Sequence, residues 1–177
     1  ISVLDSITLC SSETGYTDLT FAGNGPWNYS YSINGADQGA FGSIANNDSV
    51  LVTQSGSYVF SGFSDSLCPS DASDTTFVTI LQNPILALSE DVAICSGDSV
   101  VLASPDEANV TYAWTGDGYF SSPDEQSTQY SQTQVGTTSA FYSIVLTAHA
   151  GVCITVDSLV ATVNPYPLDA LIDGPSD

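Results

Sequence analysis

The chain has 177 residues, 42% of them hydrophobic, which is enough for one large or two small packed domains. It contains 20 acidic residues, one histidine and neither lysine nor arginine, so its formal net charge is −20. Because lysine and arginine bind phosphate groups and anionic lipids, this composition excludes nucleic acid and anionic membrane surfaces as partners. Cations remain natural partners, and mutual repulsion of the carboxylates predicts a dependence on salt or divalent ions.

Short runs of β-branched and aromatic residues, separated by clusters of Gly, Asn, Asp and Ser, predict β-strands along the whole chain. No window has a helical apolar period, and no apolar run is long enough for membrane insertion. Two successive sets of strands predict an all-β chain of two tandem antiparallel β-sandwiches. The predicted strands are 2–10, 18–22, 27–33, 49–53, 57–63 and 76–81 in the first half, and 86–94, 99–103, 111–114, 128–130, 140–148 and 159–163 in the second.

The four cysteines indicate one module used twice. Cys10 and Cys68 are 58 residues apart, and so are Cys95 and Cys153. Of the three possible pairings, only Cys10–Cys68 with Cys95–Cys153 respects the repeat, so we expect one disulfide in each sandwich, joining loops at one end. An even number of cysteines without close metal-type spacing predicts an oxidising, extracellular compartment.

Each half closes with a predicted strand that runs into Asn-Pro, at 83–84 and 164–165. We therefore expect two domains, 1–83 and 84–167, with a short junction that proline stiffens because it fixes φ. The tail 168–177 is similar in sequence to the segment that leads into the second domain. It either begins a further module or adds as a strand to another copy.

Three motifs resemble a known group of repeats. The segments GNGPWNYSYSING (23–35), ICSGDSVVL (94–102) and TYAWTGDGYFSS (111–122) resemble PKD-like and immunoglobulin-like (Ig-like) modules of large secreted surface adhesins and gliding-type filaments of Bacteroidota. The resemblance implies Ig-like or PKD-like sandwiches at the cell surface, with neighbouring modules or copies of the same protein as partners. It implies a structural or adhesive, non-catalytic role.

The same resemblance implies O-glycosylation. Proteins of that group carry glycans at Asp-Ser or Asp-Thr sequences, and this chain has six such sites. The implied acceptors are Ser6, Ser49, Ser66, Thr75, Ser99 and Ser158.

No residue pattern predicts catalysis. His149 is the only conventional base near neutral pH, and neither a nucleophile motif nor a second histidine accompanies it, so we expect a solvated loop histidine and no enzyme. No cofactor is expected. The acid-rich loops 104–109 and 121–126 offer oxygen ligands for Ca²⁺, but they lack EF-hand spacing and are expected to be solvated turns.

The two tryptophans leave one alternative function open. Trp114 alternates within its predicted strand and is expected to fill the core, whereas Trp27 follows Pro26 and is expected to be more exposed. An exposed Trp27 beside Tyr29 on a flat sheet face would stack on sugar rings. The alternative is therefore an accessory or carbohydrate-binding module of a secreted hydrolase, and surface glycans are candidate partners.

Overall fold

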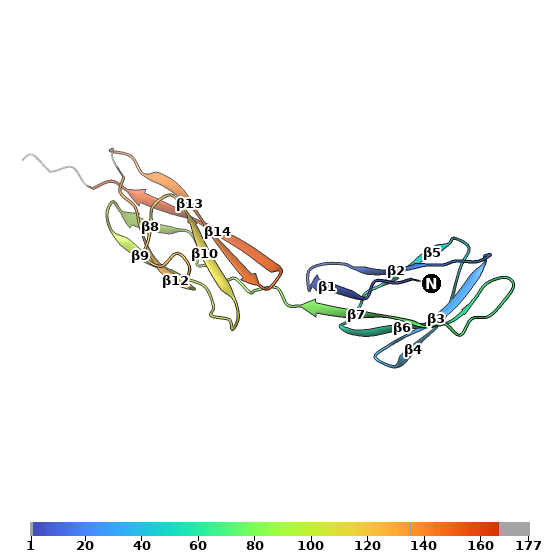
Figure 1. The fold of residues 1–177 in the computed structure, drawn as a ribbon. Coiled ribbons are helices and arrows are strands. Elements are labelled where there is room, and N and C mark those ends of the chain that lie inside the picture. Colours follow the sequence, from blue (N-terminus) through green and yellow to red (C-terminus); the bar gives the residue numbers. More distant parts are fainter. Residues whose placement is uncertain (1, 135, 167–177) are drawn as a thin grey trace, which may run out of the picture. The chain divides into compact units, whose positions relative to one another are not determined.

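A computed structural model describes residues 2–134 and 136–166 of the chain. The chain divides into two compact units, Ile1–Gln82 (unit 1) and Asn83–Asp177 (unit 2). Within the described residues all regular structure is β-strand (Figure 1). In that same part of the chain, no helix has the length and apolarity needed to cross a membrane.

Unit 1 is a sandwich of two sheets. The larger sheet has the strand order β1-β7-β6-β3-β4, and the smaller one pairs β2 with β5 (Figure 1). Neighbouring strands are antiparallel, except that β1 runs parallel to β7. The strands are β1 (Ser6–Cys10), β2 (Tyr16–Thr20), β3 (Trp27–Ile33), β4 (Ala36–Ser43), β5 (Asn47–Leu51), β6 (Gly56–Ser64) and β7 (Asp74–Leu81).

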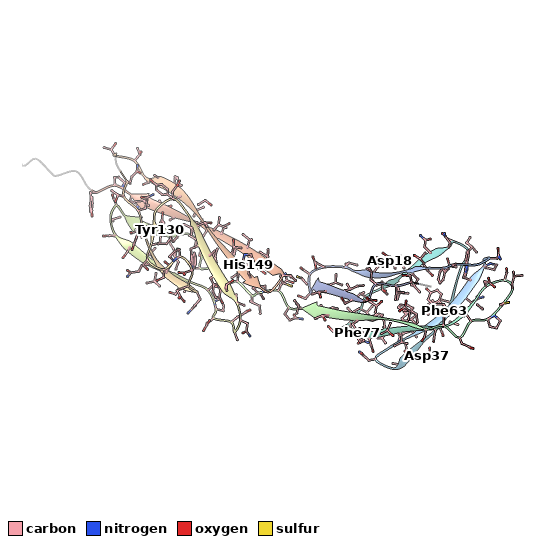
Figure 2. All side chains as sticks on the ribbon, in the orientation of Figure 1. Asp18, Asp37, Phe63, Phe77, Tyr130 and His149 are labelled. Atoms are coloured by element: carbon pink, nitrogen blue, oxygen red, sulfur yellow. The ribbon has the colours of Figure 1, made fainter. Side chains whose placement is uncertain are left out.

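The core of unit 1 follows from side-chain alternation along its strands. In β6, Tyr58 and Phe60 face inward and are completely buried. Phe63 is also buried, whereas Phe77 lies exposed on the outer face of β7 (Figure 2). Tyr29 from β3 packs against Phe60 and Phe63, with ring centroids 6.4 Å away in both cases. The apolar faces of the two sheets therefore close on an aromatic core.

Unit 2 follows the same plan, except that its fourth strand joins the smaller sheet. One sheet has the order β10-β13-β14-β8 and the other β11-β12-β9, and only β8 and β14 pair in parallel. The strands are β8 (Val92–Cys95), β9 (Ser99–Ala103), β10 (Thr111–Gly116), β11 (Tyr119–Phe120), β12 (Ser127–Ser131), β13 (Ala140–Ala150) and β14 (Cys153–Asn164).

Trp114 fills the core of unit 2, as predicted. Its side chain is 3% exposed and its indole Nε1 donates a hydrogen bond to the backbone oxygen of Glu125 at 2.8 Å. It packs in one cluster with fully buried Tyr130, Ile144 and Leu146 (Figure 2 labels Tyr130). Because the indole N–H is satisfied inside the sandwich, the ring acts as a structural core residue.

The strand order identifies both units as Ig-like. In each unit the third strand pairs with the penultimate strand, which in turn pairs with the last strand in the same sheet. The second and fifth strands pair in the other sheet. The prediction of an all-β chain with two tandem Ig-like sandwiches is thus confirmed. One detail differs, since each first strand is parallel to its last strand, whereas the prediction had antiparallel sheets throughout.

Two strands, β4 and β11, have no counterpart among the predicted ones. The chain turns from β3 into β4 through Asn34 and Gly35, whose φ values are 52° and 82°. Positive φ at both positions is typical of a two-residue type I′ hairpin turn, for which Asn-Gly is the favoured sequence. Residues 86–91, predicted as strand, are irregular, and β8 begins only at Val92. The predicted tail strand at 168–177 lies outside the described residues.

Candidate functional site: the cysteine-bearing ends of each unit

The first cysteine of each unit ends the first strand. Cys10 is the last residue of β1 and pairs with Leu81 at the end of β7. Cys95 is the last residue of β8 and pairs with Asn164 at the end of β14. We call Cys10 and Cys95 the first-strand cysteines. Each lies at the end of its unit where the last strand finishes.

The turn after each first-strand cysteine is also the same. The backbone N–H of Glu13 donates to the Cys10 oxygen at 2.9 Å, and that of Asp98 donates to the Cys95 oxygen at 3.0 Å. The residue after each cysteine donates to the last residue of the final strand, at 2.8 Å in both units. The two positions are therefore equivalent in backbone structure.

The second cysteine of each unit precedes the last strand. Cys68 lies in the loop between β6 and β7, and Cys153 is the first residue of β14. We call Cys68 and Cys153 the last-strand cysteines. Cys153 is completely buried, whereas Cys68 is exposed.

Within unit 2 the two cysteine positions lie at opposite ends. Cys95 is level with Asn164, whereas Cys153 begins the same twelve-residue strand. At a rise of about 3.3 Å per residue, the eleven steps of β14 separate them by about 36 Å. A disulfide requires Cα atoms within about 7 Å of each other, so this pair cannot bond.

The same separation holds in unit 1. Cys10 is level with Leu81, and Asp74 begins β7 about 23 Å away at the usual strand rise. Cys68 lies at the Asp74 end, next to Pro69, which forms an isolated bridge with Ser64. Cys10 and Cys68 are therefore too far apart to bond.

The cysteine states agree with these positions. Cys10 and Cys153 are disulfide-bonded. Cys68 and Cys95 are free, exposed thiols in the described structure. The predicted Cys10–Cys68 and Cys95–Cys153 bridges are therefore wrong, and so is the expectation of one disulfide within each sandwich. The cause is the parallel pairing of first and last strands, which sends the two cysteines of a unit to opposite ends.

A pocket of about 200 Å³ opens beside Cys68. The rings of Phe21 and Trp27 stack in its wall, with centroids 5.9 Å apart and planes 15° apart. Trp27 is half-buried, and its Nε1 is buried without a hydrogen-bond partner in the described residues. Ligand pockets for larger molecules usually measure about 300 to 1,000 Å³, so this one fits a single ring or side chain. Its lining residues also include Phe63, Asp65 and Pro69.

Asp65 fixes the loop that carries Cys68. Its Oδ1 accepts hydrogen bonds from the backbone N–H groups of Leu67 and Cys68, both at 2.8 Å, and its Oδ2 accepts one from Asn24 at 3.1 Å. These bonds, that from Asn24 foremost, hold the pKa of the Asp65 carboxyl below its ordinary value. The Cys68 thiol is thus presented on an ordered loop.

The aromatic platform required by the carbohydrate-binding alternative is not formed. Tyr29 is only 3% exposed, and its hydroxyl donates to Asp48 Oδ2 at 2.8 Å. Burial and this bond raise the pKa of Tyr29 above its ordinary value. Trp27 therefore has no exposed Tyr29 beside it with which to form a flat stacking surface.

The implied glycosylation sites lie apart on several strands and loops. Five of the six acceptors are exposed and Thr75 is half-buried. Ser49 Oγ donates to Asp18 Oδ1 at 2.7 Å, and Ser66 Oγ donates to the Asn24 oxygen at 2.8 Å. Glycosylation stays a prediction at all six positions: Ser6, Ser49, Ser66, Thr75, Ser99 and Ser158.

His149, which was expected in a solvated loop, lies on a β-strand instead. His149 is half-buried on β13, where it pairs with Thr111 and Ile154 (Figure 2). Among the described residues, no group of three or more His, Cys, Asp or Glu side chains could hold a metal ion. In the acid-rich loop 104–109, Glu107 Oε1 accepts a bond from the backbone N–H of Ile85 at 3.0 Å.

No protein-family model matches the sequence, and neither does any curated protein sequence. Solved structures similar to the chain include a mutated three-Ig fragment of titin, with 13% identity over 92% of this chain and a TM-score of 0.47. This chain covers 64% of that fragment's length. Fibronectin(III)-like modules of Clostridium thermocellum CbhA match 98% of this chain and 99% of their own at 12% identity, with a TM-score of 0.40. The PKD domain of human KIAA0319 matches 51% of this chain and 84% of its own at 21% identity, with a TM-score of 0.37.

Proposed function

We propose that the chain is a non-catalytic structural and adhesive segment of an extracellular filament or giant surface adhesin. The observation that carries the proposal is the route of the chain through each unit. In unit 1, the backbone N–H of Val3 donates to Asp74 Oδ2 at 3.2 Å, at the start of β7, and the last strand then ends at Leu81. The chain therefore enters near one end of the last strand and leaves at the other.

Unit 2 is threaded in the same way. The backbone N–H of Leu88 donates to Asp157 Oδ2 at 3.4 Å, in the first half of β14, and that strand ends at Asn164. A unit that receives and releases the chain at opposite ends connects in series with similar units, as in repeat proteins. This threading supports a string of modules rather than an isolated globular domain.

Charge and cysteine chemistry support an extracellular location. Disulfide-bonded cysteines such as Cys10 and Cys153 persist in oxidising compartments. A net charge of −20 keeps such a chain soluble and favours ionic surroundings that screen the carboxylates. The five exposed acceptor serines are accessible for glycosylation, and mass spectrometry of native material should find glycans on peptides with Ser49 or Ser99.

The carbohydrate-binding alternative has weaker support. It needs an exposed aromatic surface, but Tyr29 is buried and the pocket beside Trp27 has a volume of only about 200 Å³. Pull-down with insoluble polysaccharides, cellulose and chitin among them, tests this alternative directly. Retention that is lost in Trp27→Ala would favour it over the filament.

Immunogold electron microscopy of the cells that produce the protein tests the proposal itself. Antibodies raised against the purified chain should label fibres or the outer cell surface. Labelling confined to the cell interior would overturn the filament proposal. A label found only on a secreted, monodisperse enzyme would overturn it as well. Preimmune serum applied to the same cells provides the control for non-specific surface label.

A further inference from the structure

The chain shows each of its two cysteine positions once bonded and once free. Cys10 is a bonded first-strand cysteine, and Cys153 is a bonded last-strand cysteine. Cys95 is a free first-strand cysteine, and Cys68 is a free last-strand cysteine. Both positions are thus competent to form disulfides, and the two free thiols belong to unlike positions.

We propose that Cys95 of one copy forms a disulfide with Cys68 of a second copy, so that copies join head to tail. A partner within the same unit is excluded, because the other cysteine of that unit lies at its opposite end and is already bonded. Both thiols are exposed and accessible to another molecule. The inference deepens the proposed filament and rests on it for its biological setting.

A second copy is the partner that satisfies both thiols at once. Each chain carries one free cysteine of each kind, so a bond between unlike positions leaves one thiol of each kind at the ends of the product. Such a heterologous contact leaves an unused thiol at each end of the product, so further copies add in the same way and build a polymer. A bond between like positions would instead join copies symmetrically, and a chain that keeps only one of the two free cysteines would then dimerise with itself.

The surroundings of the two thiols are complementary. Tyr166 is 63% exposed and lies beside the Cys95 turn, where a Cβ added at Gly97 would come 3.1 Å from its hydroxyl oxygen. The pocket beside Cys68 is walled by the rings of Phe21 and Trp27 and has room for one ring. Insertion of Tyr166 into this pocket would bury apolar surface beside Cys68, which lines the same pocket.

The bond requires an oxidant, which we identify as an external disulfide. The two thiols lose two protons and two electrons as the Sγ–Sγ bond forms. The oxidant's own disulfide accepts them and is released as two thiols, through a mixed disulfide with one of the cysteines. Oxidised glutathione serves as this reagent in the test.

The experiment uses the full chain and the variants Cys68→Ser and Cys95→Ser, oxidised with glutathione in 0.15 M salt, where the Debye length is only about 8 Å. The unaltered chain should give a ladder of oligomers on non-reducing gels. Each variant alone should stay monomeric, whereas their mixture should give dimers and nothing larger. Peptic digestion should release a peptide containing Cys68 linked to one containing Cys95, since trypsin has no site in this chain.

The contribution of Tyr166 is measured separately. Tyr166→Ala should slow ladder formation several-fold without changing the alkylation rate of Cys95. Phe77→Ala is the matched control, because Phe77 is an aromatic residue of similar exposure on the outer face of β7. Equal rates in both variants would overturn the role of the pocket.

Three outcomes would overturn the head-to-tail bond itself: a Cys68–Cys95 bond within one monomer, single variants that dimerise as readily as their mixture, or no oligomers under oxidation. Thermal unfolding of each variant shows that it is folded. Failure here is distinguishable from failure of the proposed function, because immunogold labelling of fibres does not depend on this bond.

Discussion

Asp65 Oδ1 accepts a hydrogen bond from the backbone N–H of Cys68 at 2.8 Å, in a loop that also ties Asn24 to the same carboxylate. The free thiol thus lies on a loop whose conformation depends on one ionised side chain. The ionisation of Asp65 is therefore linked to the order of the loop backbone and to the exposure of the Cys68 thiol at one end of unit 1.

Replacing this carboxylate should loosen the loop. In Asp65→Asn one acceptor oxygen is lost, so iodoacetamide should alkylate Cys68 faster, with the rate at Cys95 as internal control. The lowered pKa of Asp65 means that its contribution is complete above about pH 4 and is lost as pH falls below that value. NMR titration of the Leu67 and Cys68 amides should show this transition below the range of a free carboxyl. Amides that titrate at the ordinary carboxyl pKa would contradict the geometry.

The cysteine states predict a simple labelling pattern. Alkylation of the folded chain without reductant should modify Cys68 and Cys95 and leave Cys10 and Cys153 untouched, because only the first two are free. Peptic peptide mapping measures the result. The assignment fails if Cys10 is labelled under these conditions.

Thr17 and Thr76 form a buried polar contact between the two sheets of unit 1. Their Oγ1 atoms are 3.1 Å apart, and Thr76 Oγ1 also donates to the Leu4 oxygen at 2.7 Å. Thr76→Val should lower the unfolding free energy by about 1 to 3 kcal/mol, because it leaves buried groups unsatisfied. Thr79→Val, on the exposed face of the same strand, is the matched control and should change little in urea unfolding. Equal effects would mean that the contact is unimportant.

Tyr29 predicts how stability changes at alkaline pH. Burial and Asp48 raise its pKa in the folded state, so above about pH 10 the unfolded chain loses the tyrosine proton while the folded chain retains it. The unfolding free energy should therefore be steady below pH 10 and fall above it. Tyr29→Phe should reduce this fall and cost about 1 to 3 kcal/mol at neutral pH, through loss of a bond to a charged acceptor.

Urea unfolding at pH 7 and pH 11 measures both effects. Tyr119→Phe is the control, because Tyr119 is 66% exposed. An unchanged alkaline slope in Tyr29→Phe would show that other groups cause the loss of stability. Tyr31 and Tyr130, whose pKa values are also raised by burial, are the next residues to examine in that case.

Local patterns in the sequence predicted the sandwiches well, but not the cysteine pairing. The alternation of apolar and polar residues around Trp114 was sufficient to place its side chain in the core, since a strand with one buried face has a period of two. The equal cysteine spacing indicated the repeat correctly, yet spacing along the chain carries no information about which end of a strand a residue occupies. That required knowing that Cys10 is level with Leu81.

The missed strand β4 has a different cause. Residues 34–39 contain two Gly, one Asn and one Asp and favour a loop by composition, and only the Asn34-Gly35 dipeptide signals a hairpin. The pocket beside Cys68 could not be predicted either, because it brings together Phe21, Trp27 and Pro69 from distant parts of the chain.

The parallel pairing of first and last strands also has a mechanical consequence. When tension pulls the two ends of unit 1 apart, β1 and β7 are drawn in opposite directions along their common axis. The bonds between Ser6–Cys10 and β7 are then sheared together, whereas pulling apart a hairpin opens its bonds one after another. Unit 2 has a shorter ladder of this kind, since β8 spans only Val92–Cys95. Under a rising stretching force, and with the disulfide of Cys10 and Cys153 reduced so that the strand ladders carry the load, unit 2 should therefore rupture before unit 1.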